Sequence, residues 1–430
     1  MSVQSADELL SFRPVDRVGM LVVHSNPLAV PGAGDAGGMT VYVREMARAM
    51  AARGVACDIF TRRDDPEAPE VTPLYPQVRV IQIDAGDPSL PKEAIPAHLP
   101  EFTANLVDAV TRLGVSYDLL HSHYWLSGKV AATLKNRWNI PFVHTFHTLG
   151  RVKNEFLRDG DPVEPEGRLL GEGRVIDEAC AIVASTMEER SWLIDLYAAH
   201  PERVHLVSPG VDHDLFTPAD RDAAKRFLGL EGKKVLLFVG RLQPLKGVDT
   251  AIRALHELVT RHAFDMSTIK FLIVGGASGS SGAGEPDNLR ALARHLGVES
   301  AIEFVSVQPQ ERLPSFYQAA DVCLVPSYVE SFGLVALEAQ ACGVPVVASS
   351  VGGLRSIVNE GQSGFLVSAG DHVGFADATA RILSNPCLSA LMTKKSVGLA
   401  KKYSWGRSAE EMYGLYSDSQ LVDCDFSRSV

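Results

Sequence analysis

The feature that most constrains the fold of this 430-residue chain is an alternation of short apolar runs with amphipathic stretches, found in both halves of the sequence. Each apolar run is rich in Val, Ile and Leu and ends at Gly, Pro or Ser, which predicts a β-strand followed by a helix. Repeated units of this kind build a doubly wound parallel sheet. The expected strands are Val18–His24, Cys57–Thr61, Val78–Ile83, Leu119–Ser122, Phe142–Thr145, Ala181–Ser185 and Val204–Val207 in the first half, and Val235–Val239, Phe271–Val274, Ile302–Phe304, Val322–Val325, Val344–Ala348 and Phe365–Val367 in the second.

Two domains follow from this pattern and from the length. We expect an α/β chain of two Rossmann-like domains, residues 1–208 and residues 209–405, with Ser208–Lys233 as the connector. A last helical stretch, residues 406–424, has no strand after it and is expected to pack back on the first domain. Ligands of such sheets bind beyond the carboxyl ends of the strands, so we expect the site in a cleft between the domains. The charged segment Gly150–Gly173 is predicted to be a loop near that cleft.

The composition argues against several classes of protein. The formal net charge of −11 disfavours general binding to nucleic acid or anionic membranes, which requires a surplus of Lys and Arg on one face. The apolar runs suit buried strands rather than membrane spans, and the first 17 residues show no secretory signal, so we expect a cytoplasmic protein. The six cysteines lack CxxC pairing and are interpreted as small hydrophobic residues, with neither a disulfide framework nor a zinc site. They are Cys57, Cys180, Cys323, Cys342, Cys387 and Cys424.

A glycine-rich segment, Pro31–Met39, stands between the first expected strand and the first expected helix. Glycines let the backbone approach an anion, and the N–H groups that open the following helix attract negative charge. Gly32, Gly34 and Gly37 also match the GxGxxG spacing of dinucleotide-binding enzymes. In those enzymes the motif follows the strand at once and an acid ends the second strand, whereas here six residues intervene and the acid is missing. A phosphate-binding loop is favoured, and a purely structural glycine loop stays open.

A second motif, Gly240–Gly247 (GRLQPLKG), follows the expected strand Val235–Val239 directly. Its two cations, Arg241 and Lys246, belong to a Pro- and Gly-containing turn at the carboxyl end of that strand. Such a turn suits the binding of a diphosphate by an otherwise acidic protein, and the cations would stabilise a leaving group. The alternative is a solvated turn with two surface cations.

A third motif, Glu330–Glu338 (ESFGLVALE), follows the expected strand Val322–Val325 and contains the start of a helix. A spacing of eight residues places Glu330 and Glu338 about two helical turns apart on one side of that helix, with one of them at its N-terminal approach. Carboxylates accept hydrogen bonds from the hydroxyls of sugars and ribose, so both are candidate ligands for such groups. The alternative is that Glu330 caps the helix and Glu338 is a buried ion-pair partner.

A group of histidines lies at or just beyond strand ends along one edge of the first expected sheet. A single histidine in such a place is more often structural, but a group at one rim favours a ligand site. Zinc is the alternative, yet no acid or cysteine completes a ligand set at the usual spacing, so we expect no metal. The histidines are His24, His121, His123, His144 and His147, accompanied by Tyr124, Trp125 and Thr148.

Taken together, these motifs resemble family 4 of the retaining glycosyltransferases, which have the GT-B fold of two facing Rossmann-like domains. The resemblance covers the chain from Val18 to about Trp405 and is carried by HSHYWLSG at His121–Gly128, GRLQPLK at Gly240–Lys246 and ESFGLVALEAQACG at Glu330–Gly343. Within the family, the chain is most similar to the enzymes that join N-acetylglucosamine to inositol phosphate at the start of mycothiol biosynthesis. Sucrose-phosphate synthases are more distant relatives.

The resemblance implies transfer of a sugar from a UDP- or GDP-sugar, without a metal or other cofactor. Lys246 and Arg241 would neutralise the departing diphosphate, and Glu330 and Glu338 would hold hydroxyls of the donor sugar and the ribose. His147 would contact the donor sugar, so the implied catalytic residues are Arg241, Lys246, His147 and Glu330. The implied donor-binding residues are Gly37, Gly38, Arg241, Lys246, Gln308, Glu330, Ser331, Phe332, Gly333, Leu334 and Glu338.

The chemistry implied by the resemblance needs no enzymic nucleophile, because the acceptor attacks on the face from which the diphosphate leaves. The residues agree with this mechanism, since the HSHYW and HTFHT segments contain no carboxylate that could act as a nucleophile or a general base. Catalysis would then depend on positioning and on stabilising the charge of the leaving group.

The acceptor site is where the sequence departs from the mycothiol enzymes. The implied acceptor residues are His24, Thr40, Lys92, Tyr124, Thr148 and Arg168. Thr40 stands where the family has Asn, and the family's phosphate-binding Arg aligns with Leu169, next to Arg168. Loss of a guanidinium would remove a bidentate charge-assisted pair worth on the order of a few kcal/mol. We therefore expect a small polar acceptor other than inositol phosphate, in specialised metabolism, such as the thiol of ergothioneine in lincomycin biosynthesis or an aminoglycoside; inositol phosphate is the alternative.

Two other functions stay open. A sugar-nucleotide epimerase would share the two domains, but the GRLQPLK and ESFGLVALE motifs favour transfer. A non-catalytic nucleotide-sugar-binding protein would keep Arg241 and Lys246 but not the rim histidines, so His147 together with Glu330 favours an enzyme. The expected partners are a nucleotide-sugar donor and a small-molecule acceptor, with neither nucleic acid nor membrane, and a homodimer is left open.

Overall fold

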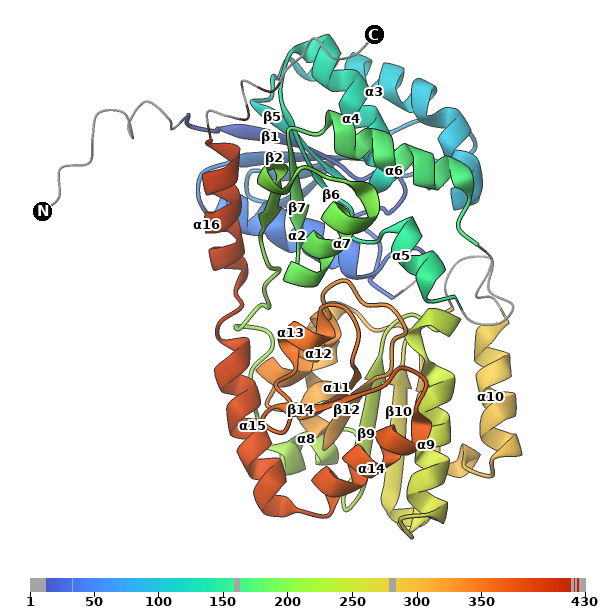
Figure 1. Cartoon of the computed structure of the whole chain (residues 1–430). Helices are drawn as coiled ribbons and strands as arrows, with labels where there is room; N and C mark the ends of the chain where they lie inside the picture. Colours follow the sequence, from blue (N-terminus) through green and yellow to red (C-terminus); the bar gives the residue numbers. More distant parts are fainter. Residues whose placement is uncertain are drawn as a thin grey trace, which may run out of the picture. The chain divides into compact units, whose positions relative to one another are not determined.

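The computed structural model describes residues 13–32, 34–157, 163–277, 284–418, 421 and 424. The start of the chain, on which the expectation of no secretory signal rests, lies largely outside these residues. The described residues form two compact units. The first unit comprises those of Met1–Ala29, Met39–Ser208 and Trp405–Val430, and the second comprises those of Val30–Gly38 and Pro209–Ser404. Each unit contains a largely parallel β-sheet with helices, which confirms the predicted α/β class (Figure 1).

The first unit contains an eight-stranded sheet in the order β3-β4-β2-β1-β5-β6-β7-β8. Neighbouring strands are parallel except for β3, which runs antiparallel to β4. The edge strand β3 was not predicted, because its residues are half-buried or exposed and include a proline, so no apolar run marks it. The strands are β1 (Arg17–Leu21), β2 (Ala56–Arg62), β3 (Val71–Tyr75), β4 (Val78–Ile83), β5 (Leu119–His123), β6 (Phe142–Thr145), β7 (Ala181–Ala184) and β8 (Val204–Leu206).

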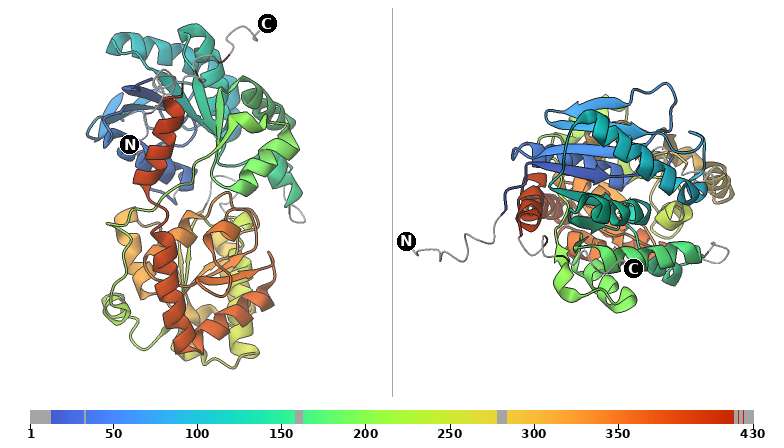
Figure 2. Two further views of the ribbon diagram at one scale, coloured as in Figure 1. Left: turned by 60° about the vertical axis from the view of Figure 1, so that its left-hand side comes forward. Right: turned by 90° about the horizontal axis from the view of Figure 1, so that it is seen from above.

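Helices pack along this sheet, and α3, α4 and α6 lie next to one another (Figure 2). The prediction of a loop over Gly150–Gly173 is wrong, because α5 and the first part of α6 occupy most of its described residues. The charges that suggested a loop pair with one another, and Arg168 lies between Glu164 and Glu172. The helices of this unit are α2 (Gly38–Ala51), η1 (Lys92–His98), α3 (Leu99–Leu113), α4 (Tyr124–Trp138), α5 (Gly150–Glu155), α6 (Glu166–Glu178), α7 (Met187–Tyr197), η2 (Pro201–Arg203) and α16 (Trp405–Tyr416).

The last helix, α16, belongs to the first unit. The hydroxyl of Ser408 donates a hydrogen bond of 2.6 Å to the carbonyl oxygen of Ser208. Near the other end of α16, the Tyr416 hydroxyl is hydrogen-bonded to Nδ1 of buried His121 at 2.6 Å. The predicted stretch continues to residue 424, but residues 419, 420, 422 and 423 lie outside the described part.

The second unit contains a six-stranded, fully parallel sheet in the order β11-β10-β9-β12-β13-β14. Alternate residues of its central strand β9 enter different apolar clusters: Leu236 and Phe238 join one, and Val235 and Leu237 join the other. Both faces of the strand are therefore buried, which explains its continuous apolar run. The strands are β9 (Lys234–Val239), β10 (Ile269–Val274), β11 (Ile302–Val305), β12 (Val322–Val325), β13 (Val346–Ser349) and β14 (Gly364–Val367).

The helices of the second unit connect these parallel strands. They are α8 (Arg221–Phe227), η3 (Pro244–Lys246), α9 (Val248–Thr260), η4 (Met266–Thr268), α10 (Glu285–His295), η5 (Glu299–Ala301), η6 (Gln310–Arg312), α11 (Leu313–Ala319), α12 (Leu334–Ala341), α13 (Leu354–Ile357), α14 (His372–Leu383) and α15 (Pro386–Ala400). Within the described part of the chain, no helix is both long and apolar enough to cross a bilayer.

The strand order of each sheet locates its ligand site. In the first sheet, the order of connection reverses between β1 and β5, and in the second it reverses between β9 and β12. A crevice forms at such a reversal, because the loops that leave the two neighbouring strands turn to opposite faces of the sheet. The predicted motifs lie there, since His24 and Tyr124 follow β1 and β5, and Arg241 and Glu330 follow β9 and β12.

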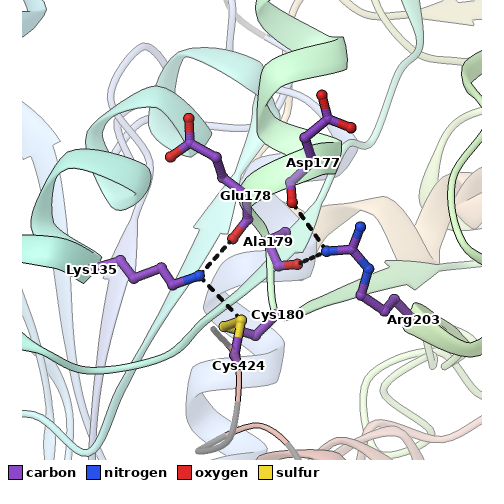
Figure 3. The surroundings of a disulfide bond; sticks show 7 residues. All are labelled: Lys135, Asp177, Glu178, Ala179, Cys180, Arg203 and Cys424. Carbon is purple, nitrogen blue, oxygen red and sulfur yellow. Dashed lines mark hydrogen bonds between the residues drawn. A yellow bond between two sulfur atoms is a disulfide. The ribbon is translucent and has the colours of Figure 1, made fainter. Parts of the chain in front are cut away.

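A disulfide joins Cys180, which directly precedes β7, to Cys424 near the end of the chain (Figure 3). The prediction of cysteines without a disulfide is therefore wrong for these two residues. Their Cα atoms are 5.5 Å apart although 244 residues separate them, and no spacing rule reveals such a pair. The Lys135 ammonium lies 3.1 Å from Cys424 Sγ and donates to the Glu178 carbonyl oxygen at the end of α6. Cys57, Cys323 and Cys342 are buried free thiols, and Cys387 is exposed.

Candidate functional site

In the second unit, the GRLQPLKG turn is fastened to the loop that follows β12. The Tyr328 N–H donates a hydrogen bond of 2.8 Å to the Leu245 carbonyl oxygen. Gly247 has a φ of +65°, and a Cβ at this position would lie 2.1 Å from the carbonyl oxygen of Pro326. Only glycine allows this approach, so the sequence of the turn itself brings it against the loop that carries Glu330.

Lys246 and Glu330 form an ion pair at this point. Lys246 Nζ donates to Glu330 Oε2 at 2.6 Å, and the Ser327 hydroxyl donates to the same oxygen at 3.3 Å. The two charged side chains are 25% and 19% exposed, so a ligand can reach both. The structure thus joins the predicted leaving-group cation to the predicted sugar-binding acid.

Arg241, the other cation of the motif, is largely buried in the second unit. Burial lowers the pKa of its guanidinium, while Asp35 and Glu330 act in the opposite direction. A Cβ on Gly37 would lie 3.3 Å from Arg241 Nε, so the glycine-rich segment approaches the guanidinium closely. Gly38 lies beside Leu334, whose Cδ1 would be 3.6 Å from a Cβ at position 38. These predicted donor-binding residues therefore lie close to one another.

The two acids of the third motif occupy different environments. Helix α12 begins at Leu334 after Gly333, which has a φ of +106°. Glu330 therefore stands in the loop that approaches the helix, and Glu338 lies within the helix. Glu338 is buried within α12 and accepts a hydrogen bond of 2.8 Å from the Tyr317 hydroxyl. Burial raises the pKa of Glu338 to about 7. Among the described residues no ion pair engages Glu338, so it is not the ion-pair partner of the alternative interpretation.

The remaining predicted donor residues lie in loops around these groups. Gln308 follows β11 and donates to the Ser306 carbonyl oxygen at 3.1 Å. Phe332 is buried, with its ring edge-on to that of Tyr403, whereas Ser331 beside it is half-buried. The buried ring of Phe332 therefore anchors this loop to the interior.

In the first unit, three predicted acceptor residues surround the ring of a fourth, Tyr124. The His24 ring centroid is 4.3 Å from that of Tyr124, Lys92 Nζ lies 4.4 Å from the ring centroid, and Arg168 Cζ lies 5.0 Å from it. Tyr124 opens α4 with a φ of +72°, a conformation that non-glycine residues rarely adopt. Strain of this kind is concentrated at functional sites, where the surrounding structure holds it.

Arg168 is buried and reaches the fifth predicted acceptor residue, Thr148. Its Nη2 donates to the Thr148 hydroxyl at 3.0 Å and to the Thr148 carbonyl oxygen at 3.1 Å. Its Nε donates to Glu172 and its Nη1 to Glu164, both at 2.8 Å. Leu169 instead faces Gly150, where its Cδ2 would be 2.7 Å from an added Cβ. The expected loss of a guanidinium from this site is therefore wrong, because Arg168 supplies one.

Thr40 does not join this group. Its side chain is fully buried, and its hydroxyl is hydrogen-bonded to that of Ser25 at 2.9 Å. As the third residue of α2, it faces the interior rather than Tyr124.

Most of the rim histidines are interior groups, which contradicts the prediction that all five line a ligand site. His121, His123 and His144 are fully buried, because β5 and β6 are covered on both faces. His121 Nε2 is hydrogen-bonded to the Thr145 hydroxyl at 2.9 Å, and burial lowers the pKa of His121 to about 3. His144 is hydrogen-bonded to the Ser122 hydroxyl at 2.7 Å. Of the five, His24 and His147 are partly exposed.

His147, the predicted catalytic histidine, follows β6 with a φ of +61°. Its Nε2 is hydrogen-bonded to Nδ1 of His123 at 3.0 Å, and burial lowers its pKa well below the usual range. A neutral imidazole at this position can donate or accept a hydrogen bond but adds no charge. Tyr42 was missed in the sequence, although its ring packs edge-on against His147 at 5.0 Å, because it reads as an ordinary apolar position of α2.

Comparison with known proteins identifies both halves of the chain. The model of the family described as "Glycosyl transferases group 1" matches residues 220–397, and that of the "Glycosyl transferase 4-like domain" matches residues 37–210. The D-inositol 3-phosphate glycosyltransferase of Acidothermus cellulolyticus is 47% identical over 94% of this chain and 90% of its own length. That of Actinosynnema mirum is 47% identical over 94% and 98%. The structure of sucrose-phosphate synthase from Thermosynechococcus elongatus matches with a TM-score of 0.86 and 32% identity, over 93% of this chain and 98% of that one.

Proposed function

This chain belongs to the GT-B glycosyltransferases of family 4, and from that premise we propose that it transfers a sugar, with retention of configuration, from a nucleoside diphosphate sugar to inositol phosphate. It is a glycosyltransferase, and the proposal concerns its substrates and its mechanism. The proposal of inositol phosphate as the acceptor depends on the contact of buried Arg168 with Thr148 and Tyr124. The relatives that share nearly half of its residues carry the name of D-inositol 3-phosphate glycosyltransferases.

The donor half of the proposal depends on Arg241 and Lys246. As the bond between the sugar and the diphosphate breaks, negative charge develops on the leaving oxygen, and fixed cations stabilise it. Lys246 is held by Glu330 before any donor binds, so its ammonium needs little reorganisation. In the described part of the chain, Lys246 and Ser327 both bond to Oε2 of Glu330, and Oε1 faces a hydroxyl of the donor sugar in this proposal. No metal is part of this mechanism.

The acceptor half depends on the two cations beside Tyr124. Arg168 shares its charge with Glu164 and Glu172, whereas no ion pair engages Lys92 among the described residues. Lys92 therefore supplies the net positive charge that a phosphate requires, and Arg168 supplies directional donors.

A second candidate is transfer to a thiol or an aminocyclitol, as in antibiotic pathways. Two observations favour it. Thr40 points to Ser25 rather than to Tyr124, and two carboxylates already engage the guanidinium of Arg168. A site with fewer free donors for phosphate would suit an acceptor that lacks this group.

Steady-state kinetics with four acceptors distinguish these candidates: inositol 3-phosphate, inositol, ergothioneine and an aminocyclitol. We expect kcat/KM for inositol phosphate to exceed that for inositol by at least about 100-fold, because the site is built to pair with an anion. The substitution Lys92→Met should remove most of that preference. The matched control is Lys129→Met, at a lysine that lies near the ring of Trp125 instead. A higher kcat/KM for the thiol or the aminocyclitol would replace inositol phosphate as the acceptor and leave the donor half intact.

The donor base and the stereochemistry are tested separately. Calorimetric titration with UDP and with GDP identifies the base through the tighter complex. Proton NMR of the product, through the coupling constant of its anomeric proton, shows whether configuration is retained. Inversion would refute the proposed attack on the leaving-group face.

A further inference from the structure

The second unit contains a pocket of about 580 Å³ at the amino ends of its strands. Lys234, the first residue of β9, and Asp321, which directly precedes β12, lie on its wall together with Arg221 and Lys225 of α8. The donor residues after β9 and β12 stand at the opposite, carboxyl ends of the same strands. The pocket, called the cation pocket below, is therefore separate from the donor site.

The wall of the cation pocket has a surplus of positive charge. Asp321 Oδ2 accepts hydrogen bonds from Lys225 Nζ and from the Val235 N–H, both at 2.7 Å, so Lys225 balances this carboxylate. Arg221 Nη1 lies 3.5 Å from the other oxygen of Asp321, and Lys234 Nζ donates to the neutral carbonyl of Leu383 at 3.0 Å. Three cations thus face one acid, in a chain whose formal net charge is −11. A local surplus of this kind selects an anionic ligand.

These cations are held in place without a ligand. Lys225 is fixed by Asp321 and also donates to the Lys233 carbonyl oxygen at 2.8 Å, and Lys234 is fixed by Leu383. Lysine side chains lose much conformational entropy when a ligand orders them. Since that ordering is already present, binding an anion here costs less than binding it to free surface lysines.

One face of α15 forms another part of the lining. Pro386, Ser389, Ala390 and Thr393 line the pocket, and their spacing of three and four residues places them on one side of the helix. Ser389 and Thr393 provide hydroxyls that can donate and accept hydrogen bonds. The remaining lining comes from Ile382 and Leu383 at the end of α14.

We propose that the cation pocket binds a phosphorylated polyhydroxy compound, such as a hexose phosphate or a polyol phosphate, as a second ligand of the enzyme. The phosphate pairs with Arg221 and Lys234, because the single charge of Asp321, already engaged by Lys225, cannot balance all three cations. Hydroxyls of the ligand bond to Ser389 and Thr393, and its C–H surface packs on Ile382. The volume suits a molecule of this size, because small-molecule sites in proteins range from roughly 300 to 1,000 Å³.

The test is calorimetric titration of glucose 6-phosphate into a full-length background variant, Lys92→Met with Lys246→Ala. This background disables both proposed substrate sites, so an error in the proposed acceptor does not affect the result. We expect one binding event per chain. Lys234→Gln added to the background should weaken it at least tenfold, whereas Lys394→Gln, at an exposed residue of α15 outside the pocket, should change it less than twofold.

If Lys234→Gln fails to fold, the same titration is made with Arg221→Gln added to the background. The Arg221 side chain is 29% exposed, so its substitution should be tolerated. It should also weaken binding severalfold. Absence of binding in the background variant would overturn the proposal. Equal affinity in the Lys394→Gln variant and in the folded pocket variants would also overturn it.

Discussion

The disulfide between Cys180 and Cys424 gives a prediction about the stability of the first unit. Replacing Cys424 by Ser removes the cross-link while leaving Cys180 as a buried small residue. A cross-link stabilises a protein mainly by restricting the unfolded chain, and the effect grows slowly with the length of the closed loop. Cys424→Ser should therefore destabilise the first unit, to which both cysteines belong.

The size of the effect follows from the 244 residues between the cysteines. If the whole loop behaves as free chain in the unfolded state, the disulfide contributes about 5.5 kcal/mol. If the second unit stays folded while the first unfolds, only roughly 50 residues of the loop are free, and the contribution falls to about 4 kcal/mol. These values correspond to a midpoint lowered by about 8 to 22 °C for a unit of this size.

Tryptophan fluorescence measures this unfolding selectively, because all four tryptophans belong to the first unit. Thermal unfolding should be followed for the wild type with and without a thiol reductant, and for Cys424→Ser under both conditions. The reductant should lower the wild-type midpoint to that of the variant and leave the variant unchanged. Cys387→Ser, at an exposed free cysteine, should behave as the wild type. Equal midpoints for untreated wild type and Cys424→Ser would refute the reasoning.

Three further predictions concern the site and the interior. Lys246→Ala should lower kcat/KM by roughly 10²–10³ through loss of leaving-group stabilisation, with an unchanged unfolding midpoint; unaltered kinetics would exclude that role. Because burial raises the pKa of Glu338 to about 7 from an ordinary value of 4.5, its contribution to stability is complete below pH 4.5 and lost as pH rises through 7. Glu338→Gln should flatten the dependence of the unfolding free energy on pH in this window, as measured by urea denaturation at pH 4.5 and 8, and an unchanged slope would contradict the shift. Tyr416→Phe should cost about 1–3 kcal/mol because it strips buried His121 of a hydrogen bond, whereas Tyr413→Phe, at a half-buried residue, should cost less than about 0.5 kcal/mol by tryptophan fluorescence.

Strands were predictable where burial on both faces produces an uninterrupted apolar run. The bounds of β4, β6 and β12 agree with the prediction at both ends, and the other predicted strands differ by up to three residues at an end. The strand β3 was not predicted, because an antiparallel edge strand with little burial has no such apolar run. The helix α6 was predicted as a loop for a different reason. The charges of Arg168, Glu164 and Glu172 suggest a loop unless it is known that they pair with one another.

The motifs of the candidate site were predictable from the sequence. Which of their side chains are buried and which are exposed was not. The turn that holds Lys246 is local, so its sequence shows its chemistry. The burial of His121 and His144 depends on helices that cover both faces of the sheet, and strand position alone does not show it. Whether position 168 or 169 faces Thr148 depends on the phase of α6, because neighbouring residues of a helix point about 100° apart.

The return of α16 to the first unit has a consequence for how the polypeptide is made. A ribosome completes residues 1–208 and then residues 209–404 before it delivers Tyr416. Until then the ring of His121 lacks the hydroxyl that meets it in the finished protein. The unit that begins first is thus completed last. A chain cut anywhere before α16 would leave this sheet with an unsatisfied group in its interior, however well its other strands had paired.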